Sequence, residues 1–558
     1  MICGKVVDMA DADIIVVGAG LAGLVAAVEA ADAGRSVIVL DQEGAASLGG
    51  QAWWSLGGLF LVNSPEQRHL RIKDSHDLAL SDWMGAAGFD RPEDFWPRRW
   101  AEAYVDFASG EKRAWLKKLG IGLFPVVQWA ERGGYQVPGH GNTVPRFHLV
   151  WGSGPGVLAP FLARIDEHVK NGKVQLRYRH RVTELIRTDD DVTGVAGEIL
   201  EPTAVGRGEP SSRVVDQEFI LACSAVIVTS GGVGGNQDLV RRNWPGGPEA
   251  APKEMLSGVP DSVDGLMLGV TERAGGRVIN ADRMWHYPEG VINHSPVWTS
   301  HAIRILSGPS PLWLDAFGHR LPAPLFPGFD SLGALRHIQT TGRDHSWFLL
   351  DQKTIGAEFS LSGSEQNPDF ASKSVKLLLT TRAGGKITPP VQAFLDRGVD
   401  FLTASTVTEL VEKMNALVGE PLIDADEVAT IVELRDGQVH AGLGKDPQVV
   451  AVNGARRYFG DRRMRTTDPH QMLDPDAGPL IAVRLHILTR KTLGGLETDL
   501  SARVLGADGA PIGGLYAAGE AAGFGGGGMH GYRALEGSFL GGCLFSGRIA
   551  GRAAAGTV

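Results

Sequence analysis

The sequence predicts an α/β fold in which parallel strands alternate with helices, and its first ordered stretch carries the evidence. An apolar run, 14–17, leads into the glycine-rich segment GAGLAG at 18–23, then into an alanine-rich helical pattern and a second apolar run, 37–40. Strand, helix and parallel strand make one βαβ unit. The length of 558 residues exceeds what one core usually holds, so two or three domains are expected.

The glycine-rich segment predicts a dinucleotide site. Gly18 permits a tight turn, Gly20 lets backbone amides approach a pyrophosphate, and Gly23 lets the helix pack on its strand. The helix then directs the positive end of its dipole at the phosphates. Asp41 follows Gly23 by eighteen residues, close to the separation at which an acidic side chain reaches the ribose hydroxyls. The alternative is a set of glycine-rich turns in an ordinary α/β sheet.

Composition and charge narrow the class of protein. The net charge of −10 offers no electrostatic footprint for nucleic acid. The cysteines Cys3, Cys223 and Cys543 are widely spaced and form no CxxC, which argues against disulfides and against metal or iron–sulfur ligation. The longest apolar run is too short and too glycine-rich to cross a bilayer. We therefore expect a cytoplasmic protein without a membrane span or a metal site.

The N-terminal half continues with loops and helices. The segment GGQAWWSLGG at 49–58 predicts a loop pressed against a flat, hydrogen-bonding ligand, with a surface loop as the alternative. Residues 65–125 show helical spacing of aromatic residues, which indicates core packing. An irregular stretch, 129–160, contains Tyr135 in a glycine-rich loop of a kind that often carries function. A helix at 156–170, strands at 174–179 and 181–187, and a strand ending in glycines at 225–232 follow.

The amino-acid composition changes in the second half of the chain. Residues 283–465 are richer in Pro, His and Trp and include helices at 407–418 and 425–435, which indicates a separate inserted domain. A basic cluster, 456–465, closes this segment, and it is interpreted as a solvated face or a set of junction salt bridges, with an anion site as the alternative. The last part, 466–558, holds a strand at 514–518, a run of glycines and a final helix at 537–555.

Four separated segments resemble one family of flavoproteins, which includes soluble fumarate reductase, the succinate dehydrogenase flavoprotein and 3-ketosteroid Δ1-dehydrogenase. They are GAGLAG with Asp41, GGQAWWSLGG, VTSGGVGGN at 228–236 and LYAAGEAAGFGGGGMHGYRALEGSFLGGCLFSGRIAG at 515–551. The resemblance implies a Rossmann-like, glutathione-reductase-type FAD-binding domain built from 1–282 and 466–558. Residues 283–465 would form an inserted α+β capping domain, with the flavin at the interface.

The resemblance also implies which residues hold FAD. Succinate dehydrogenases carry a histidine bonded covalently to FAD at the position of Gln51, so FAD is expected to bind here without a covalent bond. The adenine is expected near Val182, and the isoalloxazine ring near the start of the last helix, whose dipole would stabilise reduced flavin. The expected FAD contacts are Gly18, Ala19, Gly20, Ala22, Gly23, Asp41, Gln42, Gly50, Gln51, Ser55, Gly57, Gly58, Val182, Gly519, Glu520, Ser538 and Leu540.

The catalytic residues are expected in two motifs. In MHGYRALEG at 529–537, Tyr532 resembles the tyrosine of ketosteroid dehydrogenases that donates to a ketone, although their Ala-Gly-Pro-Gly is absent. In the same motif Arg533 lies one place before the carboxylate-binding arginine of fumarate reductases. The segment WHYP at 285–288 resembles the family's His-Pro segment and could place His286 or Tyr287 over the substrate. Tyr135 resembles the N-terminal tyrosine of the steroid enzymes.

The resulting hypothesis is a dehydrogenase that removes two hydrogens across a carbon–carbon bond beside a carbonyl, on a hydrophobic keto substrate of the 3-ketosteroid kind. A tyrosine base would need its pKa lowered by the charge of Arg533 or His286. Cap tryptophans at 285, 298, 313 and 347 favour an apolar substrate or simple core packing. The alternatives are fumarate-reductase-like reduction of a small carboxylic acid and a flavin electron-transfer subunit. The electron acceptor and the oligomeric state are unspecified.

Overall fold

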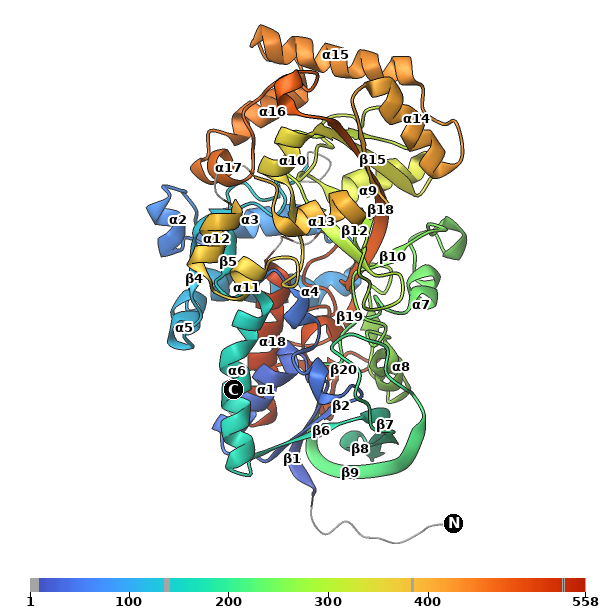
Figure 1. Ribbon diagram of the computed structural model, residues 1–558. Helices are drawn as coiled ribbons and strands as arrows, with labels where there is room; N and C mark the ends of the chain where they lie inside the picture. The colour runs from blue at the N-terminus through green and yellow to red at the C-terminus, as the bar shows by residue number, and fades with distance from the viewer. Residues whose placement is uncertain (1–9, 135–140, 383–385, 534, 536, 557–558) are drawn as a thin grey trace.

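A central sheet organises the lower half of the molecule (Figure 1). The computed structural model describes residues 10–134, 141–382, 386–533, 535 and 537–556. The sheet has the order β20-β21-β9-β1-β2-β6, with parallel pairing from β21 to β6. Its strands are β1 (Ala12–Val17), β2 (Val37–Asp41), β6 (Val174–Tyr178), β9 (Val215–Val228), β20 (Arg503–Leu505) and β21 (Pro511–Ala517). The first and last thirds of the chain thus share one Rossmann-like sheet, which confirms the expected fold class.

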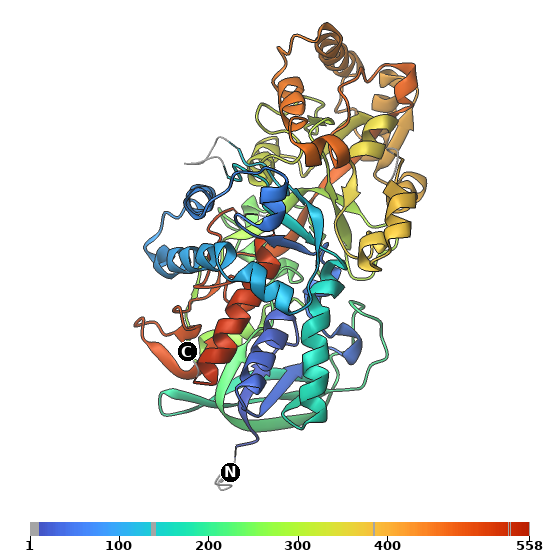
Figure 2. The same cartoon turned by 90° about the vertical axis from the view of Figure 1, so that its left-hand side faces the viewer.

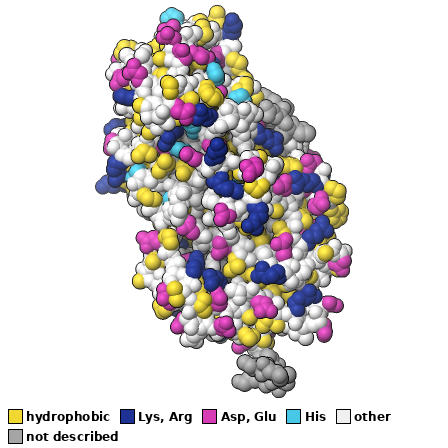
Figure 3. Space-filling view, turned by 90° about the vertical axis from the view of Figure 1, so that its right-hand side faces the viewer, with side chains coloured by type: hydrophobic (Ala, Val, Ile, Leu, Met, Phe, Trp, Pro, Cys, Tyr) yellow, Lys and Arg dark blue, Asp and Glu magenta, His cyan; other side chains and the backbone are white. Residues whose placement is uncertain are grey.

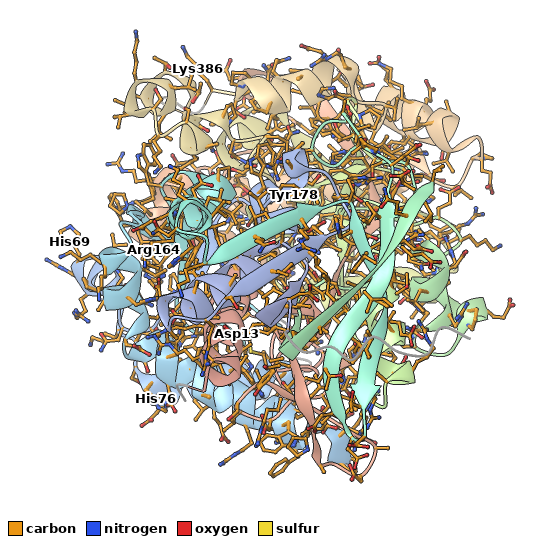
Figure 4. The ribbon with its side chains drawn as sticks, turned by 90° about the horizontal axis from the view of Figure 1, so that it is seen from below. Asp13, His69, His76, Arg164, Tyr178 and Lys386 are labelled. Atoms are coloured by element: carbon orange, nitrogen blue, oxygen red, sulfur yellow. The ribbon has the colours of Figure 1, made fainter. Side chains whose placement is uncertain are left out.

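Three helices cover one face of this sheet, and Figures 1 and 2 both show them side by side. They are α1 (Leu21–Asp32), α6 (Ser153–Lys170) and α18 (Ser538–Ala554). Small residues let α18 lie close to α1, since a Cβ on Gly547 would stand 2.5 Å from the oxygen of Ala22 and one on Gly551 2.4 Å from that of Ala26. The other face carries β7 (His180–Thr188) and β8 (Asp191–Leu200), an antiparallel pair continued by β9. Seen from below in Figure 4, Asp13 marks β1 and Tyr178 the end of β6.

Residues 65–125, which were expected to be helical, are mainly helical in the structure. They contain α2 (Pro65–His69), α3 (His76–Ala87), α4 (Phe95–Ser109) and α5 (Lys112–Lys118). Trp83 and Trp100 are 1% and 0% exposed, as expected for core residues. A small sheet of β3 (Gly58–Phe60), β5 (Phe147–Val150) and β4 (Leu123–Gln128) follows. Further elements of this part are α7 (Gln237–Arg242), β10 (Leu256–Ser257), α8 (Leu266–Arg273) and β11 (Val278–Ile279), which pairs with β19 (Gly495–Leu496).

A second, mostly antiparallel sheet forms the upper part of the molecule, here called the cap (Figure 1). Its order is β14-β15-β18-β12-β13-β16, with β10 and β17 also paired to β18. The strands are β12 (Met284–Ile292), β13 (Ala302–Leu306), β14 (Leu312–Leu314), β15 (His345–Asp351), β16 (Ser360–Leu361), β17 (Phe401–Ala404) and β18 (Leu480–Thr492). The cap helices are α9 (Ser331–Thr340), α10 (Gln352–Glu358), α11 (Pro368–Ala371), α12 (Val375–Arg382), α13 (Pro389–Arg397), α14 (Val407–Val418), α15 (Ala425–Ala441), α16 (Pro447–Ala455) and α17 (Phe459–Met464).

Hydrogen bonds also connect the part built on the central sheet to the cap, in addition to the places where the chain passes from one to the other. The segment 127–134, here called the connector, comes from the N-terminal part but hydrogen-bonds to the cap. The backbone N–H groups of Arg132 and Gly133 donate to Gly328 (3.0 Å) and Phe329 (2.8 Å), and the Arg132 guanidinium contacts Asp461 at 2.6 Å. The predicted domain limits at 282 and 465 stay predictions, and the pairing of β18 favours a cap that extends to Thr492.

The surface and the helices show two further features. Figure 3 shows Lys and Arg side chains interspersed with Asp and Glu over the face it presents. Within the part of the chain that the structure describes, no helix combines the length and the apolar character that a bilayer crossing requires.

Candidate active site

One cavity of about 740 Å³ runs between the central sheet and the cap. Its size falls in the range of ligand sites, roughly 300–1,000 Å³. We call its lower part the glycine-lined arm, which is bounded by the segments 17–22, 40–58, 180–182, 207–213, 229–231, 260–267 and 519–543. The upper part, the cap arm, is lined from β4, β5, β12, β13, β16, β18, α10, α11, α12 and α17 and the residues directly beside them.

The glycines of GAGLAG have distinct surroundings. Gly18 has φ +107°, and a Cβ there would stand 2.7 Å from the carbonyl oxygen of Thr229. A Cβ on Gly23 would stand 2.0 Å from the oxygen of Gly18, which keeps helix and turn in contact. Gly20 has no atom within 4 Å of a Cβ position and lines the cavity, so its backbone borders open space at the helix start. Ala22 also lines the cavity.

The end of β2 supplies an acidic group. Asp41 lines the cavity, and its carboxylate accepts the N–H groups of Ala19 and Glu43, both at 2.8 Å. Burial raises the pKa of Asp41 to about 6, against the lowering by these two hydrogen bonds. Gln42 donates to Asp264 at 3.1 Å, and among the described residues its buried Oε1 has no hydrogen-bond partner. Val182 of β7 lines the same arm.

The segment 49–58 and the C-terminal glycine run meet in this arm. Gln51 donates to Glu520 at 2.7 Å and accepts from Lys491, also at 2.7 Å. The second carboxylate oxygen of Glu520 accepts the N–H of Thr492 at 2.9 Å. Gly50, Gln51, Ser55, Gly58, Gly519, Glu520 and Leu540 line the cavity.

Ser538 and Gly57 stand behind the lining. Ser538 begins α18, and its hydroxyl lies 2.9 Å from Nε2 of the buried His530. A Cβ on Gly57 would stand 2.7 Å from the backbone of Ser153, so this glycine lets two segments pack together. The residues expected to contact FAD, from Gly18 to Leu540, therefore gather in one region, and their individual roles stay predictions.

These residues fit an FAD molecule. Gly20 leaves room for a pyrophosphate at a helix N-terminus, and the unpartnered Gln42 Oε1 and the Asp41 carboxylate can accept hydrogen bonds from the adenosine part. The arm also contains residues that sequence reasoning missed, above all the loop 207–213. In this loop the guanidinium carbon of Arg207 lies 4.9 Å from the ring centre of Trp53, and burial lowers the pKa of Arg207. Only its turn-rich composition distinguished this loop in the sequence.

Among the predicted catalytic residues, Tyr287 lines the cavity. It lies in β12, is 2% exposed, and has the guanidinium carbon of Arg304 3.8 Å from its ring centre. Arg304 contacts Glu131 of the connector at 3.0 Å and Glu289 at 3.7 Å. The hydroxyl of Ser331 donates to Glu131. A buried polar network therefore fixes the wall behind Tyr287.

His286 faces the other way, because successive side chains of a strand point to opposite faces. Its ring packs on Trp244 with centres 4.6 Å apart, and it does not line the cavity. Burial lowers the pKa of His286 to about 3, so it is neutral near pH 7. The expectation that its positive charge could assist a tyrosine base is therefore wrong.

The structure places Tyr532 and Arg533 outside the cavity lining. The Tyr532 hydroxyl accepts from Arg91 at 3.0 Å and lies 3.2 Å from Asp90, and the guanidinium carbon of Arg283 lies 4.1 Å from its ring centre. Arg533 pairs with Asp330 at 3.2 Å. The catalytic roles of Tyr532 and Arg533 stay predictions. Tyr135 lies outside the described residues.

The four cap tryptophans at 285, 298, 313 and 347 are buried and do not line the cavity, so they support core packing. The cavity is lined instead by other aromatic residues, namely Trp54, Trp129, Phe147, Tyr287, Phe359, Phe370, Phe524 and Phe539. The basic cluster 456–465 divides: Arg462 and Arg463 are exposed, whereas Arg465 lines the cap arm. The sequence marked Arg465 only as part of the basic cluster, and sequence reasoning missed Arg490 and Arg304, which carry no motif of their own.

Comparison with known proteins adds to this geometry. A family model described as "FAD binding domain" matches residues 13–540. A KsdD-like steroid dehydrogenase of Mycolicibacterium smegmatis is 60% identical over 550 residues, which are 99% of this chain and 100% of that protein. Another from Mycobacterium tuberculosis (strain CDC 1551 / Oshkosh) is 58% identical over 554 residues, 99% of this chain and 97% of that protein.

Among solved structures, 3-ketosteroid delta1-dehydrogenase from Sterolibacterium denitrificans, in complex with 1,4-androstadiene-3,17-dione, has the same fold. It matches with a TM-score of 0.69 at 19% identity and covers 98% of this chain and 100% of that chain. The family match spans nearly the whole sequence, and the residues that line the glycine-lined arm fit the nucleotide that it names. The chain therefore belongs to the family of FAD-binding flavoproteins that includes the KsdD-like steroid dehydrogenases.

Proposed function

We propose that this protein is an FAD-dependent dehydrogenase that removes two hydrogens across a carbon–carbon bond beside the carbonyl of a 3-ketosteroid-like compound. The observation that carries the proposal is the single cavity, because it joins the glycine-lined arm to an aromatic cap arm with Tyr287 in its wall. The names of the full-length relatives, KsdD-like steroid dehydrogenases, support the substrate class.

The reaction divides between cofactor and protein. Bound FAD supplies the hydride acceptor of such a dehydrogenase. The protein has to move a proton, and we assign this role to the phenol oxygen of Tyr287, which takes the proton from the carbon next to the carbonyl. Arg304, held by Glu131 and Glu289, fixes the ring of this tyrosine. The start of α18 lies at the cavity, which Gly537, Phe539 and Leu540 line, and the positive end of this helix dipole favours negative charge there.

FAD binds without a covalent bond in this proposal, because Gln51 offers no nucleophilic ring nitrogen and its amide is engaged by Glu520 and Lys491. Acid precipitation of the protein checks this point. All flavin is expected in the supernatant, whereas yellow colour retained in the washed pellet would contradict it.

The decisive experiment is anaerobic mixing of the purified holoprotein with 3-ketosteroids and, separately, with succinate. We expect a 3-ketosteroid to bleach the visible absorption of oxidised flavin and succinate to leave it unchanged. Bleaching by succinate alone would overturn the steroid assignment in favour of a fumarate-reductase-like enzyme. The arginines of the cap arm are the observation that keeps this second candidate open.

A flavin electron-transfer subunit without a substrate pocket is the third candidate. The volume of the cavity and its aromatic upper wall favour an enzyme over this class. If the holoprotein were reduced only by a co-purifying redox protein and by none of the small molecules above, the electron-transfer interpretation would replace the proposal.

A further inference from the structure

Acidic and basic side chains are distributed differently between the two arms of the cavity. The glycine-lined arm carries both signs, with acidic side chains at positions 41, 43, 209, 261, 264 and 520. In the cap arm, the described lining residues include no Asp or Glu but six cationic side chains: Arg304, Arg382, Lys386, Arg465, Arg490 and Lys491. The face of the molecule drawn in Figure 3 shows both signs of charge, in contrast to this lining. Among these six, Arg304 contacts Glu131, Arg382 contacts Asp369, and Lys491 donates to Gln51.

Arg465 carries a charge that no described carboxylate neutralises by an ion pair. Its guanidinium donates to the carbonyl oxygens of Trp129 at 2.8 Å and Ser307 at 2.9 Å, both neutral groups. Its acidic neighbours are Asp461, which Arg132 engages at 2.6 Å, and Glu358, whose carboxylate accepts hydrogen bonds from Ser310 and Thr467. Burial lowers the pKa of Arg465 to about 10, which shows how strongly this site disfavours an uncompensated cation.

Arg490 of β18 also lines the cap arm and also lacks an ion pair among the described residues. Its one hydrogen bond within the described residues goes to the hydroxyl of Ser362 at 3.3 Å, and no described carboxylate forms an ion pair with it. Glu365 is its acidic neighbour, and burial raises the pKa of that carboxyl to about 7. Because a guanidinium has five N–H donors, both arginines keep donors available for a ligand.

The uncharged lining of the cap arm is partly polar, from Gln128, Ser360, Ser362, Asn367 and Thr388, and partly apolar. Trp129, Leu306, Phe359, Phe370 and Met464 line it together with Tyr287. Lys386 is exposed, lies toward the outer edge of the molecule in Figure 4, and adds a further cation at the rim of this arm. A ligand that matches this wall has an apolar body and an anionic end.

From the pairing of this apolar wall with Arg465 and Arg490, we infer that the substrate is a keto compound that carries a carboxylate, held by these two arginines away from the reacting carbonyl. A guanidinium binds a carboxylate through two parallel hydrogen bonds, and burial strengthens such a pair. A neutral diketone would leave both charges uncompensated. This inference rests on the proposed dehydrogenase function and specifies its substrate.

The test compares two ligands that differ only in charge. The holoprotein is titrated anaerobically with 3-oxo-4-androstene-17β-carboxylate and with its methyl ester. The perturbation of the flavin spectrum gives the Kd of each ligand, and bleaching gives the rate of reduction. We expect the acid to bind at least about tenfold more tightly than the ester, since hydrogen bonds to charged groups are worth about 1.5–3 kcal/mol.

Variants connect this preference to the arginines. We define the preference as the Kd of the ester divided by the Kd of the acid. In Arg490→Gln this preference is expected to fall from at least about tenfold toward unity, and Arg490→Lys should restore part of it. Arg465→Gln is the second variant, with thermal unfolding measured alongside because Arg465 also anchors two backbone carbonyls. Arg462→Gln, which removes the same charge from the exposed side of α17, is the matched control and should keep the preference of the unmodified protein.

The outcomes separate the two claims. Reduction by both steroids with equal Kd values would overturn the carboxylate site and leave the dehydrogenase proposal standing. A preference for the acid that Arg490→Gln does not change would also overturn it. Tight binding of the acid that depends on Arg490 but brings no bleaching would support the anion site and overturn the proposed reaction.

Discussion

At the scale of single residues, position along a strand decides which side chain of WHYP can act. Tyr287 points into the cavity, whereas its neighbour His286 is buried against Trp244 and is neutral. Tyr532 lies among Asp90, Arg91 and Arg283, away from the lining. The structure therefore favours Tyr287 over the tyrosine that the C-terminal motif suggests.

The first prediction concerns these two tyrosines. Tyr287→Phe should leave the FAD content unchanged and slow flavin reduction by substrate about 10²- to 10⁴-fold, the usual contribution of a positioned acid or base. Stopped-flow absorption under anaerobic conditions measures this rate. Tyr532→Phe is the matched comparison and should retain a rate within a few fold of the unmodified protein. A slow Tyr532→Phe beside a fast Tyr287→Phe would return the catalytic role to the C-terminal motif.

At the scale of elements, the first βαβ unit shows how one motif separates folding from ligand binding. Gly23 is required for the contact of helix α1 with the turn before it, because a Cβ there would meet the Gly18 oxygen at 2.0 Å. Gly20 borders open space at the same helix N-terminus and has φ −74°, a value that any residue adopts. The two glycines therefore serve different purposes within one turn of backbone.

Substitutions at these two positions should give opposite results. Gly20→Thr adds a good N-cap residue, so the unfolding free energy of the apoprotein should change by less than about 1 kcal/mol while FAD content falls. Gly23→Ala should lower the unfolding free energy by about 1–3 kcal/mol through overpacking. Calorimetry of the apoprotein and flavin absorbance per chain measure the two effects. Full FAD occupancy in Gly20→Thr would refute this assignment of Gly20.

Elements with strong local signals were predictable from the sequence. The helix at 407–418 and the strand starting at Val174 have the expected limits or nearly so, because caps, periodicity and glycines mark them locally. The cap arm was not predictable from the sequence, because its arginines lie far apart in the chain. The pairing of β13 and β18 with β12 brings Arg304 and Arg490 to this arm, and Arg465 reaches it from the end of α17. The same holds for Tyr287, whose direction depends on the register of β12.

At the scale of the whole molecule, buried titratable groups set the response of stability to pH. Burial lowers the pKa of five histidines below the usual 6.5, to about 3 or 4: His148, His286, His301, His345 and His530. Three carboxyls respond in the opposite direction, with pKa values raised to about 6 or 7: Asp41, Glu358 and Glu365.

The sign of the pH dependence follows from proton uptake. Between about pH 4 and 6.5 the unfolded chain protonates these histidines and the folded chain does not, so their contribution to the unfolding free energy rises with pH. Each histidine contributes up to about 1.4 kcal/mol per pH unit. The contribution of the three carboxyls to the unfolding free energy falls with pH over this range, and they are outnumbered by the five histidines. Thermal unfolding of the apoprotein should therefore shift to higher temperature from pH 4.5 to 6, and a falling midpoint over that range would contradict the burial of these rings.

The strand β18 has a consequence for how the molecule would respond to its nucleotide. It runs through the cap sheet beside β12, β15 and β17 and ends at Thr492, whose N–H donates to Glu520 and whose hydroxyl accepts the N–H of Val233. Loading of FAD against Glu520 would restrain this anchor and, through thirteen residues of paired strand, the sheet above it. Slower amide hydrogen exchange along β18 and β15 upon reconstitution, far from any cofactor atom, is the expected signature of this mechanical coupling.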